Sequence, residues 1–149
     1  MSYTLQAFVG DLPDFQQNAL KGMTVIPLSQ GTAVIPLTVD LRDLYEVPFL
    51  VLMEESGGEM PSAIEEILRC FKRPVAYLEA EFFGGVGTQA SVVRKEHGLI
   101  FGPLVSPHAI NDALRLLGIE KGDHHDEFEA LELGKHRDTD DWIGSPKLS

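Results

Sequence analysis

The chain has 149 residues and a formal net charge of −11, because it carries 23 acidic and only 12 basic side chains. This length suits one domain over residues 1–149, and an apolar share of 44% with 23% charged residues is typical of a folded, soluble protein. Proteins that bind nucleic acid or anionic membranes neutralise phosphates with Lys and Arg, so the acidic charge argues against both partners. The first residues lack the pattern of a secretion signal, and no apolar run is long enough for a membrane helix; we therefore expect a cytoplasmic protein.

The N-terminal half begins with a strand, a short helix and a hairpin. Alternation of apolar residues over 3–9 predicts the strand. Asp11 is a typical helix N-cap and predicts a short helix over 11–21. The tetrapeptide Val-Ile-Pro-Leu then occurs on both sides of Ser-Gln-Gly, which predicts a hairpin that turns at Gly31.

The middle of the chain permits more than one secondary-structure prediction. Residues 40–46 suit a helical turn, and the apolar run 48–53 is compatible with either a strand or a helix. Apolar residues at helical spacing over 62–71 predict an amphipathic helix that ends before Pro74.

The second half contains three alternating segments and one more helix. The segments cover residues 75–83, 89–95 and 99–101, and the glycines between them predict an antiparallel meander. Ser106 followed by proline predicts the cap of a helix that ends at Gly118. Because crossover units are few, we expect an α+β fold with two layers: an antiparallel sheet, formed by the hairpin and the meander, with helices packed on one face.

A first candidate site combines the meander with the last helix. Glu79 and Glu81 lie two apart on one strand, so both carboxylates project to one face, and the glycine-rich turn that follows allows close approach of a ligand to the backbone. A small-ligand protein or a hydrolase would use Glu79, Glu81, Gly84, Gly85, Gly87, Gln89, Asn111 and Arg115. The competing interpretation is a structural hairpin turn beside a solvated carboxylate pair, because the turn lacks the glycine spacing of dinucleotide loops and the lysine of a phosphate loop.

The segment 119–149 is polar but retains Phe128, Leu131, Leu133 and Trp142, which predicts that it docks on the core. It also contains His124 and His125 among acids, yet it has no known metal-binding signature, and we expect neither a metal nor a cofactor. The stretches EFFGGVGTQA, AINDALRLLG and LGKHR with the later Asp-Trp resemble a family of small bacterial proteins without an established activity. That resemblance, over residues 75–143, implies a compact bacterial cytosolic protein whose tail belongs to the domain.

The acidic residues form two blocks, which suggests a second candidate site. Residues 31–70 hold 8 acids and 2 bases, residues 119–149 hold 9 and 4, and residues 71–118 hold 4 and 5. If the blocks converge, they form an interaction patch made of Glu65, Glu66, Asp138, Asp140 and Asp141. Such a patch favours a protein-binding module for a basic partner, for example an immunity-type inhibitor, over an enzyme. Solubility alone explains the acidity equally well, and the oligomeric state is left open.

Overall fold

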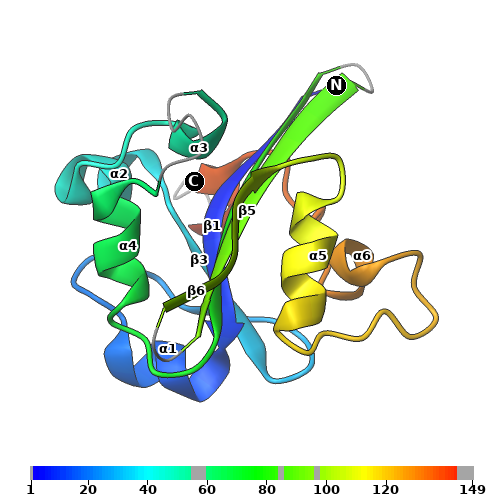
Figure 1. Cartoon of the computed structure of the whole chain (residues 1–149), viewed down its shortest axis with the longest axis horizontal. Helices are drawn as coiled ribbons and strands as arrows, with labels where there is room; N and C mark the ends of the chain where they lie inside the picture. Colours follow the sequence, from blue (N-terminus) through cyan, green and yellow to red (C-terminus); the bar gives the residue numbers. More distant parts are fainter. Residues whose placement is uncertain (1, 55–59, 84–85, 96–97, 144–149) are drawn as a thin grey trace, which may run out of the picture.

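The computed structural model describes residues 2–54, 60–83, 86–95 and 98–143. Six strands form one antiparallel sheet in the order β2-β3-β1-β4-β5-β6 (Figure 1). The strands are β1 (Ser2–Asp11), β2 (Ile26–Pro27), β3 (Thr32–Pro36), β4 (Val75–Phe83), β5 (Val86–Lys95) and β6 (Gly98–Val105). The predicted α+β class, with an antiparallel hairpin and a three-stranded meander, is confirmed.

The helices cover both faces of this sheet, not one face as predicted. Figure 1 shows α1 (Leu12–Asn18), α2 (Val39–Tyr45), α3 (Val51–Glu54) and α4 (Ser62–Leu68) on one side, and α5 (Ala109–Leu116) and α6 (Glu127–Ala130) on the other. A short 3₁₀ helix, η1 (Thr139–Ile143), follows α6. In the described part of the chain, no helix combines the length and the apolar character that crossing a membrane requires.

The fold has three layers, helices, sheet and helices, because the sheet carries a hydrophobic core on each of its faces. Phe8 and Tyr77 belong to the core beneath α1–α4, whereas Leu5 and Leu78 belong to the core beneath α5 and the tail. The central strands β1 and β4 are thus apolar on both faces, as strands covered on both sides are. The alternation over residues 3–9 indicates one apolar face of β1, whereas the structure buries residues on both faces.

Turn and cap residues define several element ends. Gln30 and Gly31 both have positive φ, 60° and 71°, as the tight turn of the β2–β3 hairpin requires. Asp11 caps α1 by accepting a hydrogen bond from the Asp14 amide at 3.1 Å, as predicted. Ser106 does not cap α5; the Gln89 side chain on β5 instead accepts the Ile110 amide through Oε1 at 3.0 Å.

The C-terminal segment completes one side of β1. Strand β3 pairs with β1 only from Ala7 onward. Towards the start of β1, Thr4 donates its amide to the Arg137 carbonyl at 2.8 Å, and the Gln6 amide donates to Thr139 Oγ1 at 3.0 Å. Residues 137–139 thereby occupy the edge of β1 that β3 leaves open.

Candidate functional site

Glu79 is a buried anchor of the fold. Its side chain is fully buried, and its carboxylate accepts the backbone amides of Leu52 at 2.9 Å and Met53 at 3.0 Å. The Tyr77 hydroxyl donates a third hydrogen bond to the same carboxylate at 2.6 Å. Backbone amides at the start of α3 therefore bind the group that the sequence suggested as part of a ligand site.

The hydrogen-bonded chain continues from Tyr77 to β1. Gln6 donates its amide nitrogen to the Tyr77 hydroxyl at 2.8 Å and to the Pro48 carbonyl at 3.1 Å. Burial first, and then the charge and hydrogen bond of Glu79, raise the pKa of the Tyr77 hydroxyl well above its ordinary value. The chain of three side chains connects the sheet to the segment before α3. Glu81, two residues further on, is half-buried at the same face.

The remaining residues of the predicted ligand site lie elsewhere. Gly84 and Gly85 are outside the described residues. Gly87 lies against the Phe82 ring, where an added Cβ would come within 1.5 Å of Cδ1. Gln89 is paired with Ala80, which belongs to the core under α5, so its side chain projects to the opposite face from Glu79.

Asn111 and Arg115 also lie on that opposite face, on α5, where they hold the tail. Asn111 Oδ1 accepts the Phe128 amide at 2.9 Å, and its Nδ2 donates to Asp126 at 3.2 Å. Arg115 forms an ion pair with the buried Glu127 at 3.2 Å. The sheet thus separates the two halves of the predicted ligand site, because neighbouring positions along a strand face opposite sides.

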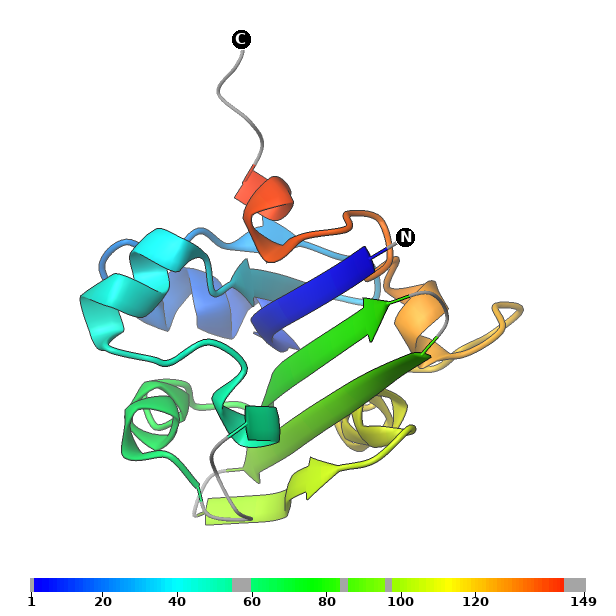
Figure 2. The same ribbon diagram turned by 90° about the horizontal axis from the view of Figure 1, so that it is seen from above.

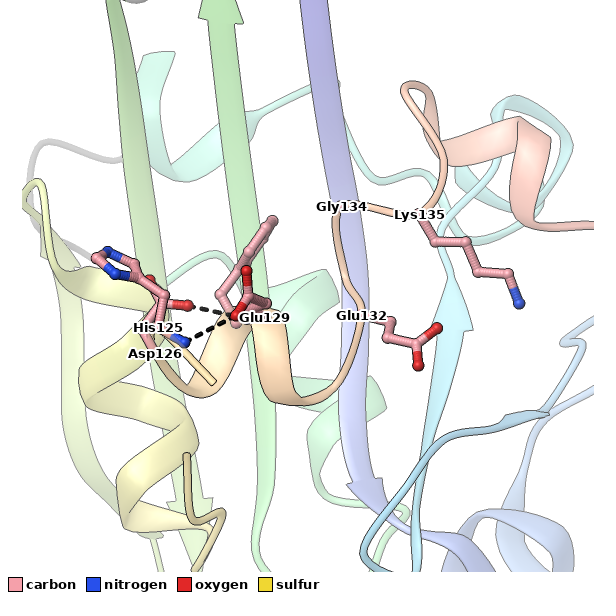
Figure 3. A pocket seen from close by; sticks show the side chains of 7 residues that line it. His125, Asp126, Glu129, Glu132, Gly134 and Lys135 are labelled. Atoms are coloured by element: carbon pink, nitrogen blue, oxygen red, sulfur yellow. Dashed lines mark hydrogen bonds between the residues drawn. The ribbon is translucent and has the colours of Figure 1, made fainter. Parts of the chain in front are cut away.

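A hollow of about 470 Å³ lies among residues 125–135 of the C-terminal segment, which Asn111 and Arg115 attach to α5. Figure 3 shows its lining: His125, Asp126 and Glu129 on one side, Glu132, Gly134 and Lys135 on the other, with Phe128 as the seventh lining residue. Phe128 is half-buried and makes an edge contact with Tyr3, with ring centroids 5.8 Å apart. Gly134 lies over the same ring, so an added Cβ would be 3.3 Å from Phe128 Cε1.

The charged side chains that line this hollow differ in the hydrogen bonds that they already make within the protein. Asp126 caps α6 by accepting the Glu129 amide at 2.9 Å. Glu129 accepts the His125 amide at 2.7 Å but remains exposed. Within the described chain, the side chains of Glu132 and Lys135 make no hydrogen bond or ion pair, and both are exposed. The lining thus includes an aromatic ring and three accessible charged side chains, of which Glu132 and Lys135 extend away from Glu129 (Figure 3).

A second, smaller hollow adjoins the first. It has a volume of about 180 Å³ and shares Glu132 and Lys135 with its neighbour. Its other side is formed by residues 26–29 and by Trp142. Trp142 is almost completely buried, and its Nε1 is a donor without an acceptor in the described structure.

The predicted acidic patch is divided in the structure. Figure 2 shows α4, which carries Glu65 and Glu66, well apart from η1, which contacts β1 and β3. Glu65 is paired with Arg69 at 3.0 Å. Asp140 instead accepts the Val39 amide of α2 at 3.2 Å. Asp138, Asp140 and Asp141 are exposed at or beside η1, on the same C-terminal segment as Glu129 and Glu132.

Sequence reasoning had not singled out Phe128, Glu129, Glu132 or Lys135 as site residues. The only signal was an aromatic side chain within an acidic stretch, and the hollow exists because Asn111 fixes the position of that stretch. Among the described residues, no group of three or more His, Cys, Asp or Glu side chains is arranged to hold a metal ion. No protein-family model, curated protein or solved structure matches the chain, so its function is inferred from the site itself.

Proposed function

We propose that this protein is a binding module for a basic protein partner, and that the hollow of residues 125–135 receives a Lys or Arg side chain of that partner. The observation that carries this proposal is the lining: the accessible carboxylates of Glu129 and Glu132 flank the hollow that the Phe128 ring also lines. An immunity-type inhibitor of a basic protein is one form that such a module takes.

The chemistry of a long basic side chain fits this lining. Its methylene stem packs on apolar surface while its charged end stays near water and carboxylates. A cation within about 6 Å of an aromatic centroid gains roughly 0.5–1 kcal/mol at an exposed site. Lys135 lines both hollows, and its positive charge offsets part of the negative charge that Asp126, Glu129 and Glu132 give the first one.

Long-range electrostatics supports the same class of partner. The chain carries a net charge of −11, and residues 119–149 hold 9 acids against 4 bases. Such a surface accelerates encounter with a positively charged protein and repels acidic ones. The alternative, a small-ligand protein or hydrolase based on Glu79 and Glu81, has less support because Glu79 is fully buried and hydrogen-bonded to Tyr77 and two backbone amides.

Binding of a short oligoarginine peptide, followed by fluorescence anisotropy, tests the proposal without knowledge of the natural partner. A Glu129→Gln/Glu132→Gln double variant should bind the peptide roughly tenfold or more weakly, because each charge pair at contact distance contributes about 1 kcal/mol in water. The matched control is Glu65→Gln/Glu66→Gln on α4, which removes the same number of charges from another surface.

The comparison of the two variants separates a site from general charge. Equal weakening by both variants would mean that net charge alone attracts the peptide, and the proposed hollow would then be wrong. A Phe128→Leu variant adds a further check, because it keeps every charge and an apolar side chain but removes the aromatic ring. Unchanged binding by this variant would exclude the contribution of the ring.

A further inference from the structure

Strand β6 is an edge strand of unusual composition. Among the described residues it pairs with β5 alone, and no described strand lies along its other edge. The opposite edge of the sheet is β2, which has two residues, one of them Pro27. Short strands and prolines protect sheet edges from pairing with other chains, and β2 has both features. Strand β6 has eight residues, and its first four, 98–101, precede the Gly102–Pro103 pair that interrupts the regular edge.

The side chains of β6 are apolar on both faces. Its register with β5 places Phe101 and Leu104 on the α5 side of the sheet, and Leu99 and Val105 on the α3 side. Leu99 is 36% exposed, Ile100 49%, Leu104 37% and Val105 50%. Strands that are apolar on both faces are normally covered on both faces, as β1 and β4 are here. The exposure of β6 therefore indicates a missing neighbour.

The distribution of charge indicates which neighbour fits. Strand β6 contains no charged residue, and residues 71–118 hold 4 acids and 5 bases in a chain of net charge −11. A basic protein is attracted to the acidic parts of the surface, so charge does not direct it to β6. Two copies of this acidic chain repel each other over most of their surfaces, and they repel least where the surface is neutral.

We infer that β6 pairs with β6 of a second copy of this chain, antiparallel about a two-fold axis, so that one sheet runs through the dimer. Residues 98–101 supply the free backbone groups, since Pro103 has no amide hydrogen to donate. A two-fold pairing of identical edges is closed and does not continue into a fibre.

Sedimentation velocity over a range of protein concentrations tests this dimer. Ile100→Lys should weaken dimer formation by roughly tenfold or more, because the two-fold axis brings both introduced charges to one edge. The control is Leu44→Lys on α2, where an apolar residue of similar exposure, 53%, receives the same charge on a helix that lies well away from β6 (Figure 2). This control should dimerise like the wild type.

Amide hydrogen exchange of the unmodified protein gives a second readout that does not depend on a variant. The outward amides of residues 98–101 should exchange more slowly at high than at low concentration. Higher salt should strengthen the dimer, because it screens the repulsion of two acidic chains, whereas salt weakens binding of a basic partner. A monomer at all concentrations, or a dimer in which Ile100→Lys and exchange at β6 have no effect, would refute the inference and leave the peptide-binding proposal untouched.

Discussion

Replacing Tyr77 by Phe removes one hydroxyl from the middle of the buried chain between Gln6 and Glu79. The hydroxyl donates to the Glu79 carboxylate at 2.6 Å and accepts from Gln6 at 2.8 Å. A hydrogen bond to a charged group contributes about 1.5–3 kcal/mol to stability. Both neighbours keep other partners, the Leu52 amide for Glu79 and the Pro48 carbonyl for Gln6, so we expect a loss within this range at pH 7.

The pH dependence of this loss provides a sharper test. The pKa of Tyr77 is raised in the folded state, so the hydroxyl keeps its proton at pH values where the unfolded chain loses it. Its contribution is complete below the unfolded pKa of about 10 and declines above that pH by about 1.4 kcal/mol per pH unit. The difference in stability between wild type and Tyr77→Phe should therefore shrink by about 1.4 kcal/mol from pH 7 to pH 11.

Urea denaturation of both proteins at several pH values measures this difference. Titration of lysines and of the other tyrosines affects both proteins alike and cancels in the comparison. A difference that stays constant from neutral to alkaline pH would contradict the assignment of Tyr77 as a buried, proton-retaining donor. A Tyr77→Phe protein as stable as the wild type at pH 7 would show that the hydroxyl makes no net contribution.

Three further changes test packing, capping and the tail. Gly87→Ala places a Cβ within 1.5 Å of an aromatic carbon on the neighbouring strand and should cost about 1–3 kcal/mol in urea denaturation, whereas Gly98→Ala, with nothing within 4 Å of the new atom, should not. Asp14→Ala removes the acceptor of two backbone amides in the α4–β4 connection, and we expect a loss of about 3 kcal/mol or more. A chain truncated before Asp123 should lose the cooperative thermal transition that a chain truncated after Ile143 keeps. The shorter chain lacks three large buried side chains, each of which contributes about 1.5–3 kcal/mol. Equal melting curves would show that the tail does not stabilise the fold.

Local patterns predicted most of the sheet. The hairpin at Gly31 follows from two apolar segments that flank a turn, and the meander follows from period-two alternation. The same patterns do not tell how many layers cover a strand. Gln6 and Phe8 lie on the second face of β1, and both are almost fully buried.

The burial of Glu79 could not be predicted from local patterns either, because its hydrogen-bond partners are distant in the sequence. Its partners at Leu52 and Met53 lie 27 and 26 positions earlier, in a run that was compatible with either a strand or a helix. Burial of a carboxylate depends on donors brought from elsewhere in the chain. The hollow beside Phe128 likewise depends on Asn111, 17 residues away, and no local pattern records that contact.

The closure of β1 by residues 137–139 has a consequence during synthesis of the chain. The Gln6 amide donates to Thr139 Oγ1, and Thr139 is made 133 positions later. At about 5–20 residues per second, a ribosome needs roughly 7–27 s to extend the chain over that distance. Until residues 119–143 are made, the part of the sheet face that the tail later covers remains accessible to chaperones and to other nascent chains. Substitutions in the tail should therefore lower the yield of folded protein in cells in addition to the stability of the folded molecule.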